Sequence, residues 1–160
     1  GTRGVGYEVT FLSEQIAAVV GQTQPWHVVI VGAGHLGSAL AAYQGFGARG
    51  VRVSAVVETD PQLIGTEIDG IEIQSIEELA AVVADESISM AVIATPPTAA
   101  QGAVDALVAA GVRSILNFAP TAVQVPADVD IRQVDVATEL QILGYHAHRR
   151  AVADPQAVNL

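Results

Sequence analysis

Three glycines with the spacing Gly32-x-Gly34-x-x-Gly37 are the residues whose types and spacing point most directly to chemistry. Between a strand and a helix, glycines at this spacing allow a tight turn, a close approach of a pyrophosphate and close packing of the helix on the strand. The helix N-terminus then offers N–H groups and the positive end of its dipole to the phosphates. The motif therefore predicts a dinucleotide site, with a tight turn that binds no ligand as the alternative.

An acidic residue at the end of the next apolar run favours NAD as the dinucleotide. Glu58 lies 58 − 37 = 21 residues after Gly37. A carboxylate at this position accepts hydrogen bonds from the hydroxyls of the adenine ribose. The same carboxylate would repel a 2′-phosphate, and no arginine follows it in the stretch ETDP, residues 58–61. We therefore expect NAD to be preferred over NADP.

Two further loops are expected to lie at the nicotinamide end of this site. The stretch TPPTAAQ (95–101) follows one apolar run, and NFAP (117–120) follows the next. In an open parallel sheet, ligands bind at the carboxyl ends of the strands, where both loops would meet. The alternative for any single residue of these loops is that it only connects a strand to a helix and contacts no ligand.

No set of residues with the pattern of a catalytic site accompanies these motifs. His27 begins a predicted strand, and His35 lies within the glycine turn. His146 and His148 are two residues apart on the last predicted helix, a spacing unsuited to chelation from one helix face. The sequence has no cysteine and no lysine, which excludes thiolate and Schiff-base chemistry within it. We therefore predict no catalytic residue, no metal ligand and no enzymatic activity.

The composition is that of a folded domain with little affinity for nucleic acid. The 160 residues are 51% hydrophobic and 15% charged, enough to build one domain with a sizeable core. The net charge is −10, and nucleic-acid binding draws mainly on clustered positive charge. No apolar stretch reaches the roughly 18 residues that would span a bilayer. We expect a cytoplasmic protein with no membrane partner.

Strand and helix patterns alternate along the chain, and each element must position part of the candidate site. Such alternation predicts an α/β fold with a doubly wound parallel sheet, the Rossmann fold. Ser75 is expected to cap one helix, with Glu78 completing a capping box. The predicted strands are 26–31, 52–57, 71–74, 90–94, 114–118 and 131–134, and the predicted helices are 8–20, 36–46, 76–84, 97–110 and 135–148.

The last predicted helix carries apolar residues on more than one side. Val136, Leu140 and Leu143 share one face, whereas Ile142 and Tyr145 lie on others. A helix that only covers its own sheet needs a single apolar stripe. Two apolar sides predict that the helix packs between two subunits, with an ordinary packing helix of a monomer as the alternative.

Six motifs in order give the chain a more specific resemblance. They are RGVGYEV (3–9), VVIVGAGHLGSALAAYQGF (28–46), ETDP (58–61), GTEIDGIEI (65–73), NFAP (117–120) and VDVATELQ (134–141). Together they resemble the Rex family of redox-sensing transcriptional repressors. The resemblance implies a homodimer whose subunits each have an N-terminal winged-helix DNA-binding domain, a Rossmann domain and a helix exchanged with the partner. It also implies that NADH binding drives release from operator DNA, whereas NAD+ competes for the same pocket and permits DNA binding.

For this chain, the resemblance implies a linker and helix over 1–24, a Rossmann NAD(H)-binding domain over 25–134, a C-terminal dimer-exchange helix over 135–150 and a frayed tail over 151–160. These residues do not include the winged-helix domain. Because the resemblance assigns DNA binding to that domain, operator DNA would be contacted only through it. Tyr43 would lie near the nicotinamide and pair with Asp135 of the partner subunit. The expected cofactor-binding residues are Gly32, Ala33, Gly34, His35, Leu36, Gly37, Tyr43, Glu58, Thr95, Pro96, Asn117, Phe118, Ala119 and Asp135.

Two departures from the family pattern and two alternative functions accompany this interpretation. Val136 stands where the family commonly has a larger apolar residue, and Glu58 stands where aspartate is common. The first alternative is the cofactor-binding domain of an NAD-dependent oxidoreductase. The second is a CoA-binding domain, against which Glu58 argues because CoA carries a 3′-phosphate on the ribose.

Overall fold

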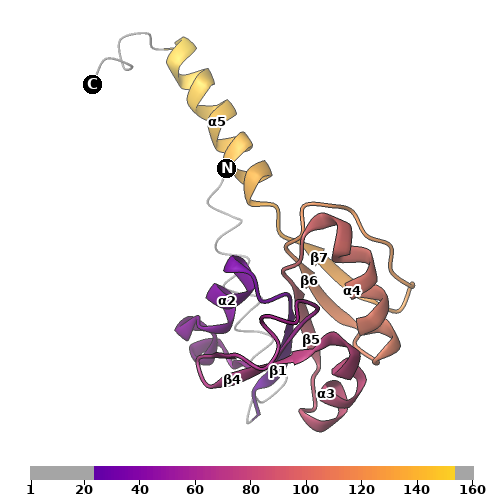
Figure 1. The fold of residues 1–160 in the computed structure, drawn as a ribbon. Helices are drawn as coiled ribbons and strands as arrows, with labels where there is room; N and C mark the ends of the chain where they lie inside the picture. The colour runs from indigo at the N-terminus through magenta and orange to yellow at the C-terminus, as the bar shows by residue number, and fades with distance from the viewer. Residues whose placement is uncertain (1–23, 154–160) are drawn as a thin grey trace.

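Seven strands form the central sheet in the order β3-β4-β2-β1-β5-β6-β7 in the computed structural model, which describes residues 24–153 (Figure 1). The strands are β1 (Trp26–Val31), β2 (Val51–Glu58), β3 (Glu67–Ile68), β4 (Ile71–Ser75), β5 (Met90–Ile93), β6 (Ser114–Asn117) and β7 (Asp130–Gln133). The helices are α2 (His35–Ala41), α3 (Leu79–Asp85), α4 (Pro97–Ala109) and α5 (Val136–Ala153), with 3-10 turns η1 (Gln44–Arg49) and η2 (Ile76–Glu78).

The sheet is parallel except at one edge, where β3 pairs with β4 in the antiparallel sense. Strand order runs outward from β1 in both directions, first through β2 and then through β5. The carboxyl ends of β1 and β5 are therefore the topological switch point, where ligands bind in sheets of this kind. The predicted doubly wound Rossmann topology is confirmed. The predicted helix at 8–20 lies outside the described residues.

The apolar runs of the strands supply a core on both faces of the sheet. Val29 and Val31 of β1 belong to one buried cluster, together with side chains of α3 and α4 such as Leu79 and Leu107. Ile30, which points the other way, belongs to a second cluster with Ala41 of α2 and with residues of β2 and β4. Because parallel strands are buried on both faces, they read as continuous apolar runs rather than as alternating patterns. No helix among residues 24–153 is long and apolar enough to cross a membrane.

The helix predicted over 36–46 is shorter than expected. Helix α2 ends at Ala41, and Tyr43 adopts an extended conformation (φ −70°, ψ 117°) before η1 begins. Glycines are poor helix formers, and Gly45 and Gly47 follow directly in the sequence. A Cβ atom at Gly45 would overlap the ring of Tyr43, so the glycine also makes room for this ring. The predicted single helix is therefore wrong beyond Ala41.

Other boundaries differ by smaller amounts. Ser75 does cap the next helical segment, but its Oγ accepts from the N–H of Glu77 at 3.3 Å, and a 3-10 turn precedes α3. The short strand β3 was not predicted. Helix α5 continues to Ala153, past the predicted end at His148, so the first three residues of the predicted frayed tail are helical.

The glycine turn between β1 and α2 is packed tightly against the two neighbouring strands. The N–H of Gly32 donates to the carbonyl oxygen of Val57 at 2.9 Å. Gly32 has φ +104°, and a Cβ atom there would lie 2.6 Å from the carbonyl oxygen of Ala94. A Cβ atom at Gly37 would overlap the carbonyl oxygen of Gly32. Two of the three motif glycines are therefore required by the fold itself.

We predict that Gly37→Ala destabilises the protein because backbone, which cannot move aside cheaply, fills the space that the methyl group needs. Overpacking of this kind costs about 1–3 kcal/mol. Gly102→Ala is the matched control, because a Cβ atom at this position of α4 meets nothing within 4 Å. Replacing glycine by alanine within a helix is expected to stabilise by about 0.5–1 kcal/mol. Urea unfolding measures both, and an equal effect of the two substitutions would contradict the prediction.

Candidate functional site

Gly34, the middle glycine of the motif, is the one that the fold does not require. Its φ of −69° suits any residue, and a Cβ atom there would meet nothing within 4 Å. The residue is exposed at the N-terminal end of α2. In this position of the motif, the absence of a side chain lets a pyrophosphate approach the backbone. The open space at Gly34 fits a bound dinucleotide.

Glu58 closes the turn from the end of β2. Its Oε2 accepts a hydrogen bond of 2.7 Å from the N–H of Ala33, and its Oε1 accepts one of 2.7 Å from the N–H of Thr59. Partial burial raises the pKa of Glu58, but the hydrogen bonds from Ala33, Thr59 and Asp60 outweigh this and hold the pKa below its usual value. The side chain is therefore an anion at neutral pH, fixed beside the turn. An oxygen of a carboxylate accepts more than one hydrogen bond, so Oε2 retains capacity for a ligand hydroxyl.

The start of α2 and the end of β5 complete the surroundings of the turn. His35 and Leu36 are exposed on the first turn of α2, whereas Ala33 is buried beneath them. The Oγ of Ser38 donates to the carbonyl oxygen of Ala33 at 3.0 Å and holds the turn from within. Among the described residues, Oγ1 of Thr95 is buried and has no hydrogen-bond partner. A buried hydroxyl without a partner is costly, so this atom fits a ligand group at the switch point.

Pro96 and the loop after β6 lie next along the sheet. Pro96 is exposed and immediately precedes α4. Asn117 is completely buried, and all of its polar atoms are engaged: Oδ1 accepts from Ala119 N–H at 3.0 Å, and Nδ2 donates to Oε1 of Gln133 at 2.9 Å. Gln133 in turn donates to the carbonyl oxygen of Ala119 at 2.8 Å. In this structure Asn117 and Ala119 contact protein, and they act by fixing the loop that carries Phe118.

Three aromatic side chains gather on the face of the sheet that α2 covers. Tyr43 and Phe46 meet edge to face, with ring centroids 4.8 Å apart and an interplanar angle of 81°. Together with Phe118 they line an apolar groove of about 530 Å³. Tyr43 is 58% exposed, so one side of its ring is open to a ligand or to another chain. Tyr43 and Phe118 thus line the same groove.

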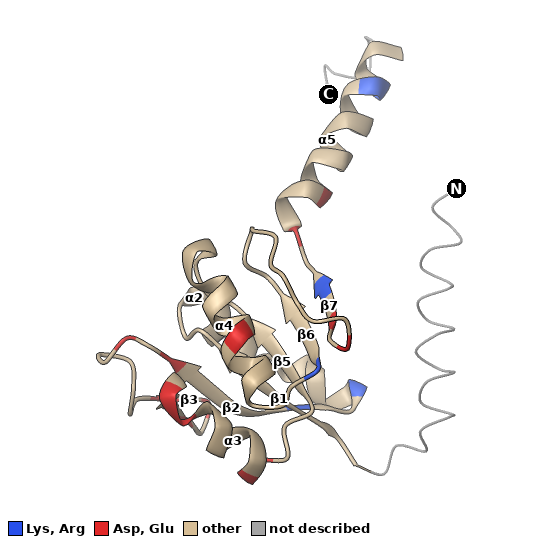
Figure 2. Cartoon of the chain, turned by 90° about the vertical axis from the view of Figure 1, so that its right-hand side faces the viewer, with Lys and Arg blue, Asp and Glu red and all other residues tan. Residues whose placement is uncertain are grey.

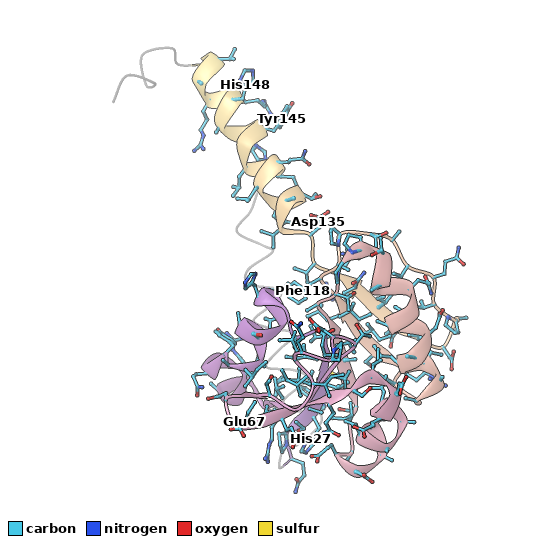
Figure 3. All side chains as sticks on the ribbon, in the orientation of Figure 1. His27, Glu67, Phe118, Asp135, Tyr145 and His148 are labelled. Carbon is cyan, nitrogen blue, oxygen red and sulfur yellow. The ribbon has the colours of Figure 1, made fainter. Side chains whose placement is uncertain are left out.

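Asp135 lies elsewhere, at the start of α5 (Figure 3). Its carboxylate accepts from the N–H of Thr138 at 3.1 Å and from the Oγ1 of Thr138 at 2.8 Å, as a helix cap does. These hydrogen bonds lower the pKa of Asp135. Asp135 lines a shallow depression with Pro120 and Gln133, whereas Tyr43 lines the apolar groove. An exposed anion is therefore held rigidly at the junction between the sheet and α5.

Helix α5 extends away from the sheet, as Figures 1 and 2 show from two directions. None of its 18 residues is buried. Val136, Leu140 and Leu143 on one side are 60–62% exposed, and Tyr145 on the other side is 62% exposed. A long helix with two exposed apolar sides is typical of an element that packs against another molecule.

Two residues that organise the site were not predicted. Gln133 carries no motif, and only its position at the end of a strand beside NFAP could have suggested a role. Thr138 was detectable, because a polar residue three positions after Asp135 at a helix start indicates a cap. Within residues 24–153 no group of three or more histidine, aspartate or glutamate side chains is placed to hold a metal ion.

The fold and the site together define a Rossmann-type domain, with its glycine turn at the switch point and an acidic residue at the end of the second strand. The family described as the CoA binding domain matches residues 23–121. The chain is 53% identical over 157 residues to the redox-sensing transcriptional repressor Rex of Streptomyces griseus, covering 98% of this chain and 62% of the relative. It is 44% identical over 146 residues to Rex of Syntrophomonas wolfei, covering 91% and 70%. The chain belongs to the Rex family, whose members are named as transcriptional repressors and not as enzymes.

Solved structures agree with this membership. The fold is similar to RSP, a Rex-family repressor, in its complex with β-NADH, with a TM-score of 0.79 and 28% identity over 92% of this chain and 71% of that one. RSP in complex with β-NAD+ and operator DNA gives a TM-score of 0.78 at 27% identity, over 94% and 70%. The chain spans 58–62% of the length of the curated Streptomyces relatives that it matches.

We predict that the contribution of Glu58 to stability is lost in acid. A carboxyl group whose pKa is lower in the folded state than in the unfolded state stabilises above its unfolded pKa, and this contribution disappears as pH falls through the folded pKa. Parent protein should therefore exceed Glu58→Gln in free energy of unfolding near pH 7, and the difference should shrink below the usual pKa of 4.5. Urea unfolding between about pH 7 and about pH 3 tests this. A difference that is constant over this range would contradict the role of the ionised carboxylate.

Proposed function

We propose that this chain is the NADH- and NAD+-sensing and dimerising part of a redox-responsive transcriptional repressor. The observation that carries the proposal is the hydrogen bond between Glu58 and Ala33, which fixes a carboxylate beside an open glycine turn. A dinucleotide presents a ribose diol and a pyrophosphate at the spacing of these two features. Membership of the Rex family supports the regulatory role, because its named members are redox-sensing repressors.

The turn and Glu58 would hold the adenosine and phosphate half of the ligand. The open space at Gly34 admits the pyrophosphate, and Oε2 of Glu58 accepts from a ribose hydroxyl. His35, Leu36 and Gly37 supply the N–H groups of the first turn of α2, which have no partner within a helix. This half of the ligand is the same in NADH and NAD+, so these contacts give affinity without discrimination between the two.

Discrimination would come from the other half of the ligand. The nicotinamide ring is positively charged in NAD+ and neutral in NADH. Tyr43, Phe46 and Phe118 would give the ring mostly apolar surroundings. Burying the cationic ring of NAD+ there costs more free energy than burying the neutral ring of NADH. The hydroxyl of Thr95 is the polar group available to a ligand at the switch point. The site would therefore favour NADH.

A dimer would convert this preference into a change of structure. We propose that α5 is exchanged between two subunits, so that its exposed apolar sides are covered by the partner. Asp135 of the partner subunit would then pair with Tyr43, next to the ring. A ligand shifts a two-state equilibrium only by the difference between its affinities for the two states. The nicotinamide ring is charged in one redox form and neutral in the other. Beside an anion at the subunit interface, the two forms would therefore differ in their affinity for the two states of the dimer.

Operator DNA would be contacted by a winged-helix part of the protein outside these 160 residues. RSP is a Rex-family repressor whose structure was solved with operator DNA, and the curated Streptomyces relatives are longer than this chain. The net charge of −10 makes the chain itself a poor DNA ligand, and Figure 2 shows the positions of Asp and Glu in red on several elements of the fold. A repressor that acts on chromosomal DNA in a bacterium works in the cytoplasm.

A CoA site is the second candidate, because the matching family is described as the CoA binding domain. CoA carries a phosphate on the same ribose whose hydroxyls Glu58 would bind. Two anions in contact would repel each other, and no lysine occurs in the sequence to compensate. We therefore place NADH above CoA, and the titration below separates the two.

We predict that the chain binds NADH more tightly than NAD+, NADPH or CoA. The Gly34→Ala variant should weaken binding of NADH at least about tenfold, which corresponds to about 1.4 kcal/mol. The physical reason is that the methyl group of the new alanine would occupy space that no protein atom fills and that the pyrophosphate of the ligand would need. Isothermal titration calorimetry with the four ligands measures both effects.

The fold supplies the control for this experiment. Gly34→Ala should leave the urea midpoint close to that of the parent, because the added methyl group meets no protein atom within 4 Å. Equal affinities for NADH and NAD+ would overturn the sensing role. Tighter binding of CoA than of NADH would instead assign the site to CoA.

We predict that Asp135→Ser weakens the effect of NADH on the dimer while leaving α5 intact. Serine caps a helix about as well as aspartate, so the substitution removes the charge and keeps the cap. Small-angle scattering of the dimer with and without NADH should change less than it does for the parent. Thr138→Val is the control, because it removes a hydroxyl that contacts Asp135 but leaves the charge in place. Scattering changes equal to the parent's would contradict the proposed pairing with Tyr43.

A further inference from the structure

The loop after β6 contributes to two concave surfaces on opposite faces of the sheet. Phe118 and Arg132 line the apolar groove, whereas Pro120 and Gln133 line the shallow depression. Arg132 and Gln133 are neighbours on β7, and successive side chains of a strand point to opposite faces of its sheet. The loop therefore presents Phe118 to the proposed ligand site and Pro120 to the other face.

Hydrogen bonds within the loop hold it closed. Oδ1 of Asn117 accepts from the N–H of Ala119 at 3.0 Å, and Nδ2 of Asn117 donates to the carbonyl oxygen of Thr121 at 3.3 Å. The N–H of Thr121 donates to the carbonyl oxygen of Ala119 at 2.8 Å. The N–H of Phe118 donates to the carbonyl oxygen of Ile93 in β5 at 2.9 Å. The amide of Asn117 and the carbonyl of Ala119 thus have partners within the loop itself.

Gln133 ties this closed loop to the end of β7. Its Oε1 accepts from Nδ2 of Asn117 at 2.9 Å, and its Nε2 donates to the carbonyl oxygen of Ala119 at 2.8 Å. Since both partners already have a hydrogen bond within the loop, the bonds of Gln133 are not needed to satisfy them. What these bonds add is a connection between the loop and the strand that leads into α5.

The same strand end carries the start of α5. The N–H of Val134 donates to the carbonyl oxygen of Asn117 at 2.9 Å. Asp135 caps the helix through two hydrogen bonds from Thr138. Because none of the residues of α5 is buried, the direction of the helix relative to the sheet is set at this junction. Gln133 is two residues from the carboxylate that fixes the helix start.

We propose that Gln133 is a positioning residue that couples the nicotinamide end of the site to α5. A ring seated against Phe118 restricts the loop, and the two hydrogen bonds of Gln133 pass this restriction to the end of β7 and to the cap of α5. Coupling between two sites needs an element whose arrangement both sites influence, and the loop tied by Gln133 is such an element. The proposal rests on the proposed NADH site, because it concerns how occupancy of that site reaches the helix.

Hydrogen–deuterium exchange of the full chain with and without NADH tests this coupling, because exchange reports the local opening of each segment. In the parent, NADH should slow exchange in the glycine turn, in the loop 117–122 and in the first turn of α5. In Gln133→Leu, NADH should still slow the turn and the loop. Its effect on the first turn of α5 should fall at least about fivefold, the lower end of usual allosteric couplings. ADP-ribose, which lacks the nicotinamide ring, should slow only the glycine turn in both proteins.

Gln124→Leu is the matched control, because it makes the same chemical change in the same loop. Gln124 is exposed, and the side chain of Gln101 holds it through its backbone N–H and carbonyl oxygen. This variant should keep the full effect of NADH on α5.

Gln133→Glu is the second variant, for the case in which Gln133→Leu does not fold. An ionised carboxylate can accept from Asn117 but has no hydrogen to donate to the carbonyl of Ala119. The effect of NADH on α5 should therefore fall in this variant as well. Circular dichroism checks that each variant is folded.

The exchange pattern separates failure of the coupling from failure of the proposed function. A purely structural role would speed exchange of the free protein but leave the effect of NADH on α5 equal in the parent and in Gln133→Leu, which would overturn the coupling. A loss that Gln124→Leu shares would overturn it too, as would protection in the parent that does not reach α5. If NADH slowed exchange nowhere in the parent, the proposed NADH site would fail and the coupling with it.

Discussion

The hydrogen bond from the N–H of Ala33 to the carboxylate of Glu58 is the interaction on which the site depends. It joins the turn after β1 to the end of β2. The conformation of this turn sets the direction in which α2 leaves the sheet. The direction of α2 decides where Tyr43 and η1 lie, and therefore where the aromatic wall of the groove stands. One carboxylate thus holds the backbone of the turn, and in the proposed function it would also offer an oxygen to the ligand. A substitution that removes the charge affects both at once.

The two ends of the candidate site are built in different ways. At the turn, backbone geometry dominates. Gly34 differs from Gly32 and Gly37 because a Cβ atom there would meet no protein atom, so the fold does not explain the glycine. At the other end, a fully satisfied network around Asn117 fixes a loop so that Phe118 faces the groove. A buried amide with every polar atom paired rigidifies its surroundings, since any movement would leave a polar group without a partner. In the proposed function, binding and discrimination would therefore be supported by independent parts of the scaffold.

Much of this was predictable from sequence, for identifiable reasons. The apolar runs of the central strands and the glycine spacing are local signals, and Glu58 stands at a distance from Gly37 that one strand–helix unit fixes. The break of the helix at Ala41 was missed because the run from Leu36 to Phe46 is helix-compatible, and only the contact between Tyr43 and Gly45 shows why it ends. The network of Asn117 and Gln133 was missed because it joins residues that are 16 apart in sequence through a strand pairing. The roles assigned to individual cofactor-binding residues stay predictions, as do the boundaries of the domains.

The exposure of helix α5 makes the response of such a sensor depend on the concentration of the protein. A helix that buries none of its residues on its own body contributes little to the stability of a lone subunit. In the proposed dimer the free energy gained by covering its apolar sides is a free energy of association, so the fraction of assembled protein follows the law of mass action. The amount of the protein in the cell would then be a second input beside the redox state of the nicotinamide pool. Diluting the protein would shift the response as surely as changing the ratio of NADH to NAD+.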